Sequence, residues 1–250
     1  MIITPRDSDA PTLLLAAARN NAEWCAAVSR GGAFSGSVWS SPRRTPPLYP
    51  DAVSLTPEAS AAQVLEGIDT SSPGCSVKDS FAVLDLAPAG FEVLFEAQWI
   101  HRPAGPASAA TAVGPEWSAV RTAEELDAWE AAWDGEESTG LLHADLLDGD
   151  LVFLAGRRGD RIVAGAVASA GGGVVGVSNL FTVDGAEGAD GAERAEGADA
   201  AAAWAAVLDA VAARWPGLPV VGYEHGEDLD IALRAGFTPI GPLRVWLHTA

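Results

Sequence analysis

Apolar residues recur along the chain with two spacings, which predict helices and strands respectively. The clearest helix ends at Pro216-Gly217, and its apolar face is spaced at i, i+3, i+4, i+7 and i+11. A Thr122–Glu125 capping box predicts the start of another helix. From residue 116 onward the pattern predicts the order β-α-α-β-β-β-α-β-α-β. After the first strand these are helices at 122–133 and 141–147, strands at 151–155, 162–169 and 174–183, a helix through 204–215, a strand at 219–223, a helix at 227–235 and a strand at 242–248.

The first hundred residues predict fewer elements. Residues 14–28 favour a helix, and 37–39 a short strand. Thr56 followed by Pro57 is typical of a helix start, and the apolar spacing extends that helix through Ile68. Residues 83–90 lead into a strand at 92–100.

One uncharged stretch, Ile162–Val183, is long enough to span a bilayer. However, three consecutive glycines, 171–173, interrupt it, and its later half carries the polar residues Ser178 and Asn179. A hairpin of two buried strands explains this composition better than a membrane helix. We therefore expect no membrane partner.

The net charge of the chain argues against two classes of binding partner. The chain has 34 acidic and 15 basic residues, a net charge of −19, and its only lysine is Lys78. Nucleic-acid binding requires Lys and Arg to neutralise phosphates, so this balance argues against it, and equally against an anionic membrane surface. Arg43 and Arg44 form the only basic pair in the first half; they either receive an anion or lie in a surface loop.

The two cysteines, Cys25 and Cys75, are too few for a disulfide framework and lack metal-ligand spacing. We expect two buried thiols in a reducing compartment, and therefore a cytoplasmic protein. His143 and Asp145 have no further ligands near them in sequence, so no zinc site is expected.

The acidity is uneven along the chain. Residues 1–115 carry 11 acids and 7 bases, whereas residues 116–250 carry 23 acids and 8 bases. A segment of Pro, Gly and small residues separates these halves and is typical of a linker. We therefore predict a domain at 1–104, a linker at 105–115 and a domain at 116–250.

The two predicted domains end alike. Residues 86–101 read LAPAGFEVLFEAQWIH and residues 233–248 read LRAGFTPIGPLRVWLH. In each, a short helical segment reaches Gly-Phe, and a strand follows that ends in Trp, an aliphatic residue and His. This echo favours an internal duplication, with chance similarity as the alternative.

The C-terminal half resembles the GNAT superfamily of acyl-CoA-dependent N-acyltransferases. The resemblance rests on the element order and on the ending ALRAGFTPIGPLRVW at Ala232–Trp246, and it covers residues 116–250, with a fainter copy in 1–102. It implies an α/β fold class: two GNAT-like domains, each a mixed, mostly antiparallel sheet flanked by helices, with the first copy degenerate.

The resemblance also implies a mechanism. In the family, the strands equivalent to 174–183 and 219–223 part, and the pantetheine arm of acetyl-CoA lies in the gap. Acetyl-CoA would then be the co-substrate and a small amine the acceptor. The backbone at Ser178, Asn179, Leu180 and Phe181 would hold the acyl group, and Glu224 or Tyr223 would handle protons.

Two features depart from the family pattern. Its pyrophosphate loop presents backbone N–H groups and positive charge, whereas residues 184–199 here hold six acids and one arginine. At the position of the family's general-acid tyrosine stands Ala232. We read 184–199 as a solvated loop, because its repeated small and acidic triplets are typical of a low-complexity segment. A calcium site built from its carboxylates is the alternative, but their spacing does not match an EF-hand loop. The phosphates could instead meet Arg157, Arg158 or Arg161.

These departures leave two functions open. The first is an N-acyltransferase that transfers an acetyl group to a small amine. The second is a non-catalytic binding or interaction module that keeps the fold but has lost CoA. The acceptor and the oligomeric state are not determined by the sequence.

Overall fold

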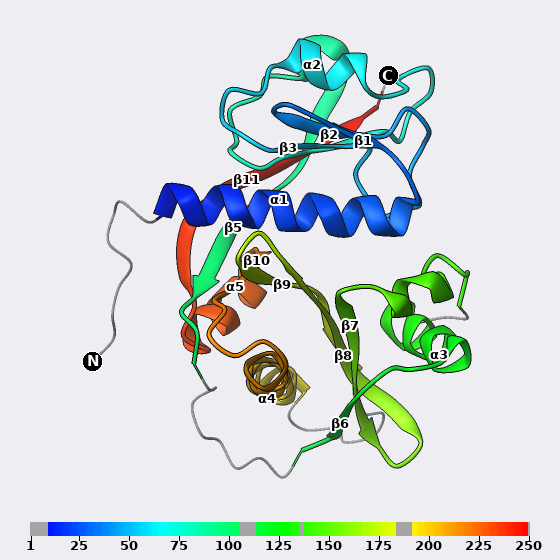
Figure 1. Ribbon diagram of the computed structural model, residues 1–250, viewed down its shortest axis with the longest axis vertical. Helices are drawn as coiled ribbons and strands as arrows, with labels where there is room; N and C mark the ends of the chain where they lie inside the picture. The colour runs from blue at the N-terminus through cyan, green and yellow to red at the C-terminus, as the bar shows by residue number, and fades with distance from the viewer. Residues whose placement is uncertain (1–9, 106–113, 136–137, 184–191, 250) are drawn as a thin grey trace. The chain divides into compact units, whose positions relative to one another are not determined.

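The computed structural model describes residues 10–105, 114–135, 138–183 and 192–249, with no side-chain description for 192–198. The chain forms two compact units. The first unit contains residues up to His101 together with Tyr223–Gly226 and Pro239–Ala250. The second unit contains Arg102–Gly222 and Glu227–Thr238. The described residues form an α/β fold in which most strand pairs are antiparallel (Figure 1). Whether the predicted boundaries at 104 and 116 delimit family domains stays a prediction.

The first unit is a sheet with helices on both faces. Helix α1 (Ala10–Ser29) lies along one face (Figure 1). Short helix α2 (Ala61–Glu66) contributes Val64 to the core on the other face, where Trp246 and Phe91 are buried. The remaining elements are β1 (Ala33–Ser35), β2 (Val38–Ser40), β3 (Ala52–Ser54), β4 (Ser76–Asp79), the 3-10 turn η1 (Ala87–Ala89), β5 (Phe91–Arg102) and most of β11 (Thr238–His248).

The second unit has a sheet between two helices. Figure 1 shows α3 (Ala123–Asp134) and α4 (Ala192–Arg214) on opposite faces of the β7–β9 strands. Its other elements are β6 (Glu116–Ala119), the 3-10 helix η2 (Ala144–Asp148), β7 (Leu151–Arg158), β8 (Arg161–Gly171), β9 (Val174–Thr182), β10 (Val220–Glu224) and α5 (Gly226–Arg234). The last residues of β10 and the first of α5 are counted with the first unit.

The two units repeat one strand arrangement. In the first, β1, β2 and β3 are consecutive antiparallel strands, and β4 then pairs parallel with β3. In the second, β7, β8 and β9 are consecutive antiparallel strands, and β10 pairs parallel with β9. A helix separates the parallel strands in both cases, but α2 has 6 residues and α4 has 23.

The Gly90-Phe91 turn of the first unit and the Gly236-Phe237 turn of the second are alike at the level of single hydrogen bonds. Gly90 and Gly236 have φ of 83° and 92°, which suits glycine because it lacks a Cβ. Each glycine N–H bonds the carbonyl three residues back, and each following Phe N–H bonds the carbonyl five residues back. The sequence echo therefore corresponds to the same backbone turn in both places.

Several predicted elements are confirmed. The Thr122–Glu125 capping box is present at α3, and the uncharged stretch 162–183 is the β8–β9 hairpin. None of the described helices is long and apolar enough to cross a membrane. Cys25 and Cys75 are buried free thiols.

Two predicted helices are wrong in extent. No helix starts at Pro57; α2 begins at Ala61, because Ser60 and Gln63 form the capping box there. Residues 141–147 form only the 3-10 helix at Ala144–Asp148. The predicted loop 184–199 is also too long, since α4 begins at Ala192; residues 184–191 lie outside the described part.

Candidate functional site

Strand β9 contains a bulge at the residues predicted to hold the acyl group. Ser178 is opposite Val167 and Phe181 is opposite Gly165, so two residues of β9 face one residue of β8. Asn179 takes a φ of 53°, a left-handed conformation that asparagine adopts more readily than most residues. A bulge leaves its extra residue out of the ladder. Backbone groups of Asn179 and Leu180 are therefore outside the β8–β9 register.

The bulge follows the point where β9 loses its other neighbour. Strand β10 pairs with β9 at Val220–Val175 and Val221–Gly176, and the register ends there. Beyond Gly176, the edge of β9 toward β10 has no partner strand among the described residues. An edge of this kind accepts an extended chain by backbone hydrogen bonds.

The Phe181 side chain has a packing role. Its ring meets the Trp129 ring edge-on at 5.1 Å, and Trp129 Nε1 donates to the Leu154 carbonyl. Gly165 lies below both rings; a Cβ there would be 2.5 Å from each. Close packing thus fixes the end of the bulge to α3, while the cofactor role of the backbone stays a prediction.

Two residues discussed in the sequence analysis, Ala232 and Arg158, have the following surroundings. Ala232 is buried in α5, and its carbonyl accepts the Phe237 N–H, so no side chain there can donate a proton. Arg158 lies 3.7 Å from Asp199, so part of its charge is matched within the protein. Among the described residues, no cluster of three or more His, Cys, Asp and Glu side chains is placed to hold a metal.

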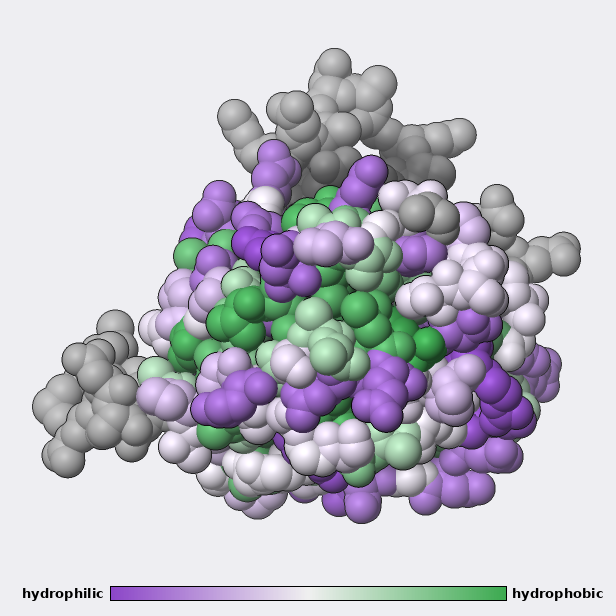
Figure 2. Space-filling view, turned by 90° about the horizontal axis from the view of Figure 1, so that it is seen from above, coloured by the Kyte–Doolittle hydropathy of each residue, from purple (hydrophilic) through white to green (hydrophobic). Residues whose placement is uncertain are grey.

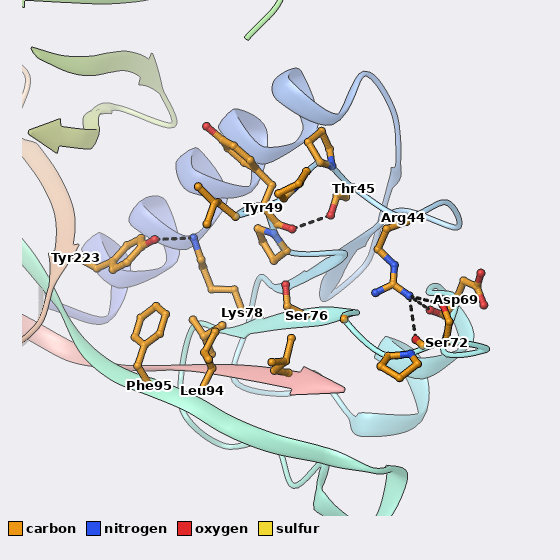
Figure 3. Close-up of a pocket in the computed structure, with 18 residues that line it drawn as sticks. Arg44, Thr45, Tyr49, Asp69, Ser72, Ser76, Lys78, Leu94, Phe95 and Tyr223 are labelled. Atoms are coloured by element: carbon orange, nitrogen blue, oxygen red, sulfur yellow. Dashed lines mark hydrogen bonds between the residues drawn. The ribbon is translucent and has the colours of Figure 1, made fainter. Parts of the chain in front are cut away.

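A second feature, which the sequence analysis missed, is a pocket of about 650 Å³ in the first unit (Figure 3). The segment 44–50 forms one side, and strands β4, β5 and β11 form the other. Tyr223, one of the two residues predicted to handle protons, lines it. Glu224 is half-buried and is not among the lining residues.

Lys78 lies in the wall of this pocket, on β4. Its Nζ donates to Asn21 Oδ1 at 2.7 Å and to the Tyr223 hydroxyl at 3.2 Å (Figure 3). Burial lowers the pKa of Lys78, but the Tyr223 oxygen and Cys25 sulfur outweigh it, so the pKa lies above its usual value. The side chain is therefore a cation at neutral pH. Tyr223 also packs edge-on against Trp99 at 5.5 Å.

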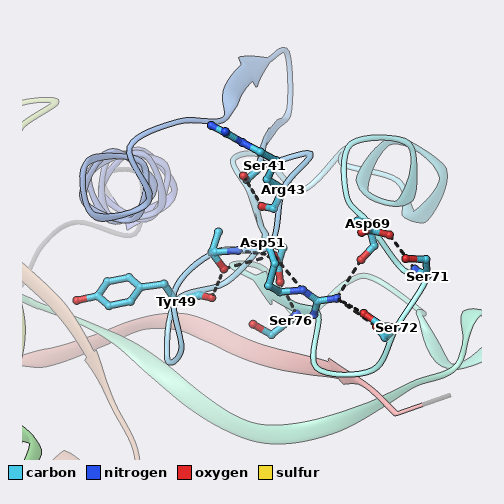
Figure 4. A network of polar contacts seen from close by, with 10 residues as sticks. Ser41, Arg43, Tyr49, Asp51, Asp69, Ser71, Ser72 and Ser76 are labelled. Atoms are coloured by element: carbon cyan, nitrogen blue, oxygen red, sulfur yellow. Dashed lines mark hydrogen bonds and ion pairs between the residues drawn. The ribbon is translucent and has the colours of Figure 1, made fainter. Parts of the chain in front are cut away.

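Arg44 closes the opposite end of the pocket. Its Nη2 donates to the Asp69 and Ser72 carbonyls, and its Nε is 3.9 Å from Asp51 (Figure 4). Asp51 in turn accepts the Thr45 and Ser76 N–H groups. Arg44, one of the two residues of the basic pair at 43 and 44, therefore stabilises the loop at 44–51 through these contacts.

Among the residues whose side chains the structure describes, the buried carboxylates accept hydrogen bonds from backbone N–H groups. Asp79 accepts the N–H groups of Leu84 and Phe81, and Glu130 accepts those of Thr139, Leu141 and Leu142. Burial raises the pKa of Glu130, but the hydrogen bonds from Leu142 and Thr139 lower it more, so it stays below its usual value. These groups anchor loops and are not free to act as bases.

Comparison with solved structures decides the fold. A GCN5-related N-acetyltransferase from Kribbella flavida superposes with a TM-score of 0.61 at 18% identity, covering 94% of this chain and 96% of that chain. The chain has the GNAT fold. A GCN5-related N-acetyltransferase-like protein from Streptococcus suis gives 0.53 at 11% identity, with coverage of 86% and 85%. A structure from Novosphingobium aromaticivorans, titled as a GNAT-family acetyltransferase, gives 0.55 at 15%, with coverage of 98% and 100%.

The likeness to these GNAT structures extends over both units, because each covers more than four-fifths of the chain. No family model matches the sequence, and no curated protein matches it either. The GNAT fold is therefore visible in the backbone and not in overall sequence similarity.

Proposed function

We propose that this protein is an acyl-CoA-dependent N-acyltransferase that transfers an acetyl group to a small amine. The observation that carries the proposal is the β9 bulge at Ser178–Phe181, next to the point where β10 stops pairing. The GNAT neighbours support acyl transfer at the level of the fold. We further propose that the two halves arose by duplication, as the repeated strand arrangement and Gly-Phe turns suggest.

The backbone supplies what acetyl-CoA needs. Beyond Gly176, the edge of β9 that has no partner strand among the described residues presents N–H and C=O groups. The amides of the pantetheine arm can hydrogen-bond to these groups in the way that an added β-strand would. The N–H groups of the bulge would donate to the thioester oxygen, which gains negative charge as the amine attacks. No residue type is required for this, so a chain of low sequence similarity can retain it.

Two protons move in the reaction. The amine nitrogen forms a bond to the acyl carbon, the carbon–sulfur bond breaks, and the amine loses a proton while the CoA thiolate gains one. We assign the first transfer to Glu224 and the second to Tyr223, the two residues that follow Gly222 on β10. Tyr223 accepts a hydrogen bond from Lys78, so its own O–H remains a donor and the ammonium stabilises the phenolate that is left.

A second candidate function is a binding module that keeps the fold without catalysis. Ala232 favours it, since it removes the family's usual general acid, and the six acids of 184–199 oppose a polyanion. A like-charge contact at a few ångströms costs about 1 kcal/mol in water.

The test is release of free CoA thiol from acetyl-CoA in the presence of a panel of small primary amines. The proposal predicts amine-dependent thiol release that falls in Glu224→Gln, while Glu227→Gln on the neighbouring exposed turn leaves it unchanged. No thiol release with any amine, together with no acetyl-CoA binding by the folded protein, would instead favour the binding module.

A further inference from the structure

The pocket of the first unit holds a cation that the protein itself does not neutralise. Lys78 is the only lysine in the chain, and its side chain is 5% exposed. Its two hydrogen-bond partners are the Asn21 side-chain amide and the Tyr223 hydroxyl, and neither is a carboxylate. Among the described residues, no carboxylate lies within ion-pair distance of its Nζ. The ammonium is thus held by two hydrogen bonds and by no carboxylate among these residues, so an anion that enters the pocket would supply the formal counter-charge it lacks.

The two buried carboxylates of the first unit, Asp79 and Asp51, cannot serve as the missing partner. Asp79 follows Lys78 on β4 and therefore points to the opposite face of the sheet, where Leu84 N–H and the Ser54 hydroxyl occupy its oxygens. Asp51 is buried among the Thr45 and Ser76 N–H groups beside Arg44. Both are fully used, so the charge of Lys78 remains open to the pocket.

The rest of the wall is mostly apolar. Val245 and Leu247 of β11 lie opposite Lys78 and Ser76 of β4, and Phe95 stands beside them (Figure 3). Leu48 and Leu94 at the rim are 75% and 55% exposed. Apolar side chains gather in the view of Figure 2 with hydrophilic ones around them, while the apolar rim of this pocket is given by the exposure of Leu48 and Leu94. Exposed apolar area bordering a pocket is typical of a ligand site.

We propose that this pocket binds a small organic acid with an apolar body, whose carboxylate pairs with Lys78 and Tyr223 and whose carbon skeleton lies against Phe95, Val245 and Leu247. A single cation suits a monocarboxylate, since the guanidinium of Arg44 is already engaged by Asp51 and two carbonyls. The volume of about 650 Å³ accommodates a ligand of medium-chain or aryl size. The lining residues all belong to the first unit, and of these only Tyr223 also has a part in the proposed acyl transfer.

The single lysine makes a direct test available. Lysine labelled with ¹³C at the ε carbon gives one side-chain resonance from the whole chain, provided that any affinity tag lacks lysine. The labelled protein is titrated at neutral pH with octanoate, with octanamide as the neutral match and with inorganic phosphate as an anion without an apolar body. Calorimetry on the same samples gives the affinities.

We expect octanoate to shift the Lys78 resonance in a saturable way and to bind at least tenfold more tightly than octanamide. Equal affinity for octanoate and octanamide, an unshifted lysine signal, or no binding of either would overturn the proposal. A shift by phosphate as strong as that by octanoate would also overturn it, because the site would then recognise charge alone.

A pair of variants separates charge from packing. Lys78→Met removes the ammonium and keeps an unbranched apolar side chain; it should lose at least tenfold in octanoate affinity and leave octanamide unchanged. Arg244→Met removes a cation of β11 that pairs with Glu96 and does not line the pocket, and it should leave both affinities unchanged. If Lys78→Met does not fold, the wild-type comparison of octanoate with octanamide still decides the proposal.

Discussion

The hydroxyl of Tyr223 lies 3.2 Å from the ammonium of Lys78, although 145 positions separate the two residues in sequence. The Lys78 nitrogen also lies 4.4 Å from the centre of the Tyr223 ring, so the cation meets both the edge oxygen and the ring. A phenol held in this way keeps its own proton available and has a positive charge beside it. The pair therefore connects the residue proposed as proton donor with the buried cation of the pocket.

Tyr223→Phe tests the proton-donor role. The variant keeps the ring that packs on Trp99 and removes only the hydroxyl, so it should fold. We expect kcat for acetyl transfer to fall by roughly 10²-fold, the lower range for loss of a general acid. The chain has only one other tyrosine, Tyr49, and Tyr49→Phe is the matched control in a steady-state assay. Equal rates for both variants would remove Tyr223 from the mechanism.

The lowered pKa of Glu130 leads to a prediction about how the stability of the second unit depends on pH. Since its pKa lies below its usual value of 4.5, its stabilisation is present above that pH and is lost as the pH falls through the folded-state pKa. Glu130→Gln should lower the free energy of unfolding by about 1–3 kcal/mol at pH 7, because it leaves buried N–H groups without a full acceptor. Urea unfolding at pH 7 and below pH 4 measures this; a difference between variant and wild type that does not shrink at low pH would contradict it.

The packing below the bulge gives a prediction about stability. In Gly165→Ala the new methyl would meet both Phe181 and Trp129 at 2.5 Å, so both rings or the strand between them must move. We expect a loss of about 1–3 kcal/mol in the free energy of unfolding, the usual cost of overpacking a core. Gly149→Ala is the control, since nothing approaches its Cβ position closer than 3.7 Å. Chemical denaturation of both variants checks this, and similar midpoints for the two would show that the rings have room.

Much of the second unit could be predicted from the sequence because its signals are local. A capping box, a glycine triplet and an apolar face at helical spacing each act within a few residues, and the structure has the corresponding elements. The helix predicted to start at Pro57 is wrong because the sequence has a second start signal at Ser60. The structure uses Ser60, whose side chain forms the capping box with Gln63.

The pocket could not be predicted in the same way. Strands β3 and β4 have three and four residues, too few for an alternation of apolar and polar residues to be recognised. In addition, β4 pairs with β11, which lies at the far end of the sequence. The partners of Lys78 come from positions 57 and 145 residues away. A lone lysine in an acidic chain was the one signal available, and its burial depends on contacts that only the fold creates.

The central claim is that acetyl-CoA binds along β9 in the second unit, and calorimetric titration at low salt tests it most directly. We predict saturable binding at micromolar strength, retained in Asn179→Gly, which still adopts the positive φ of the bulge. Asn179→Val, whose branched side chain opposes that conformation, should weaken binding by tenfold or more. No heat at millimolar acetyl-CoA with the folded wild-type protein, or equal binding by the two variants, would contradict the account.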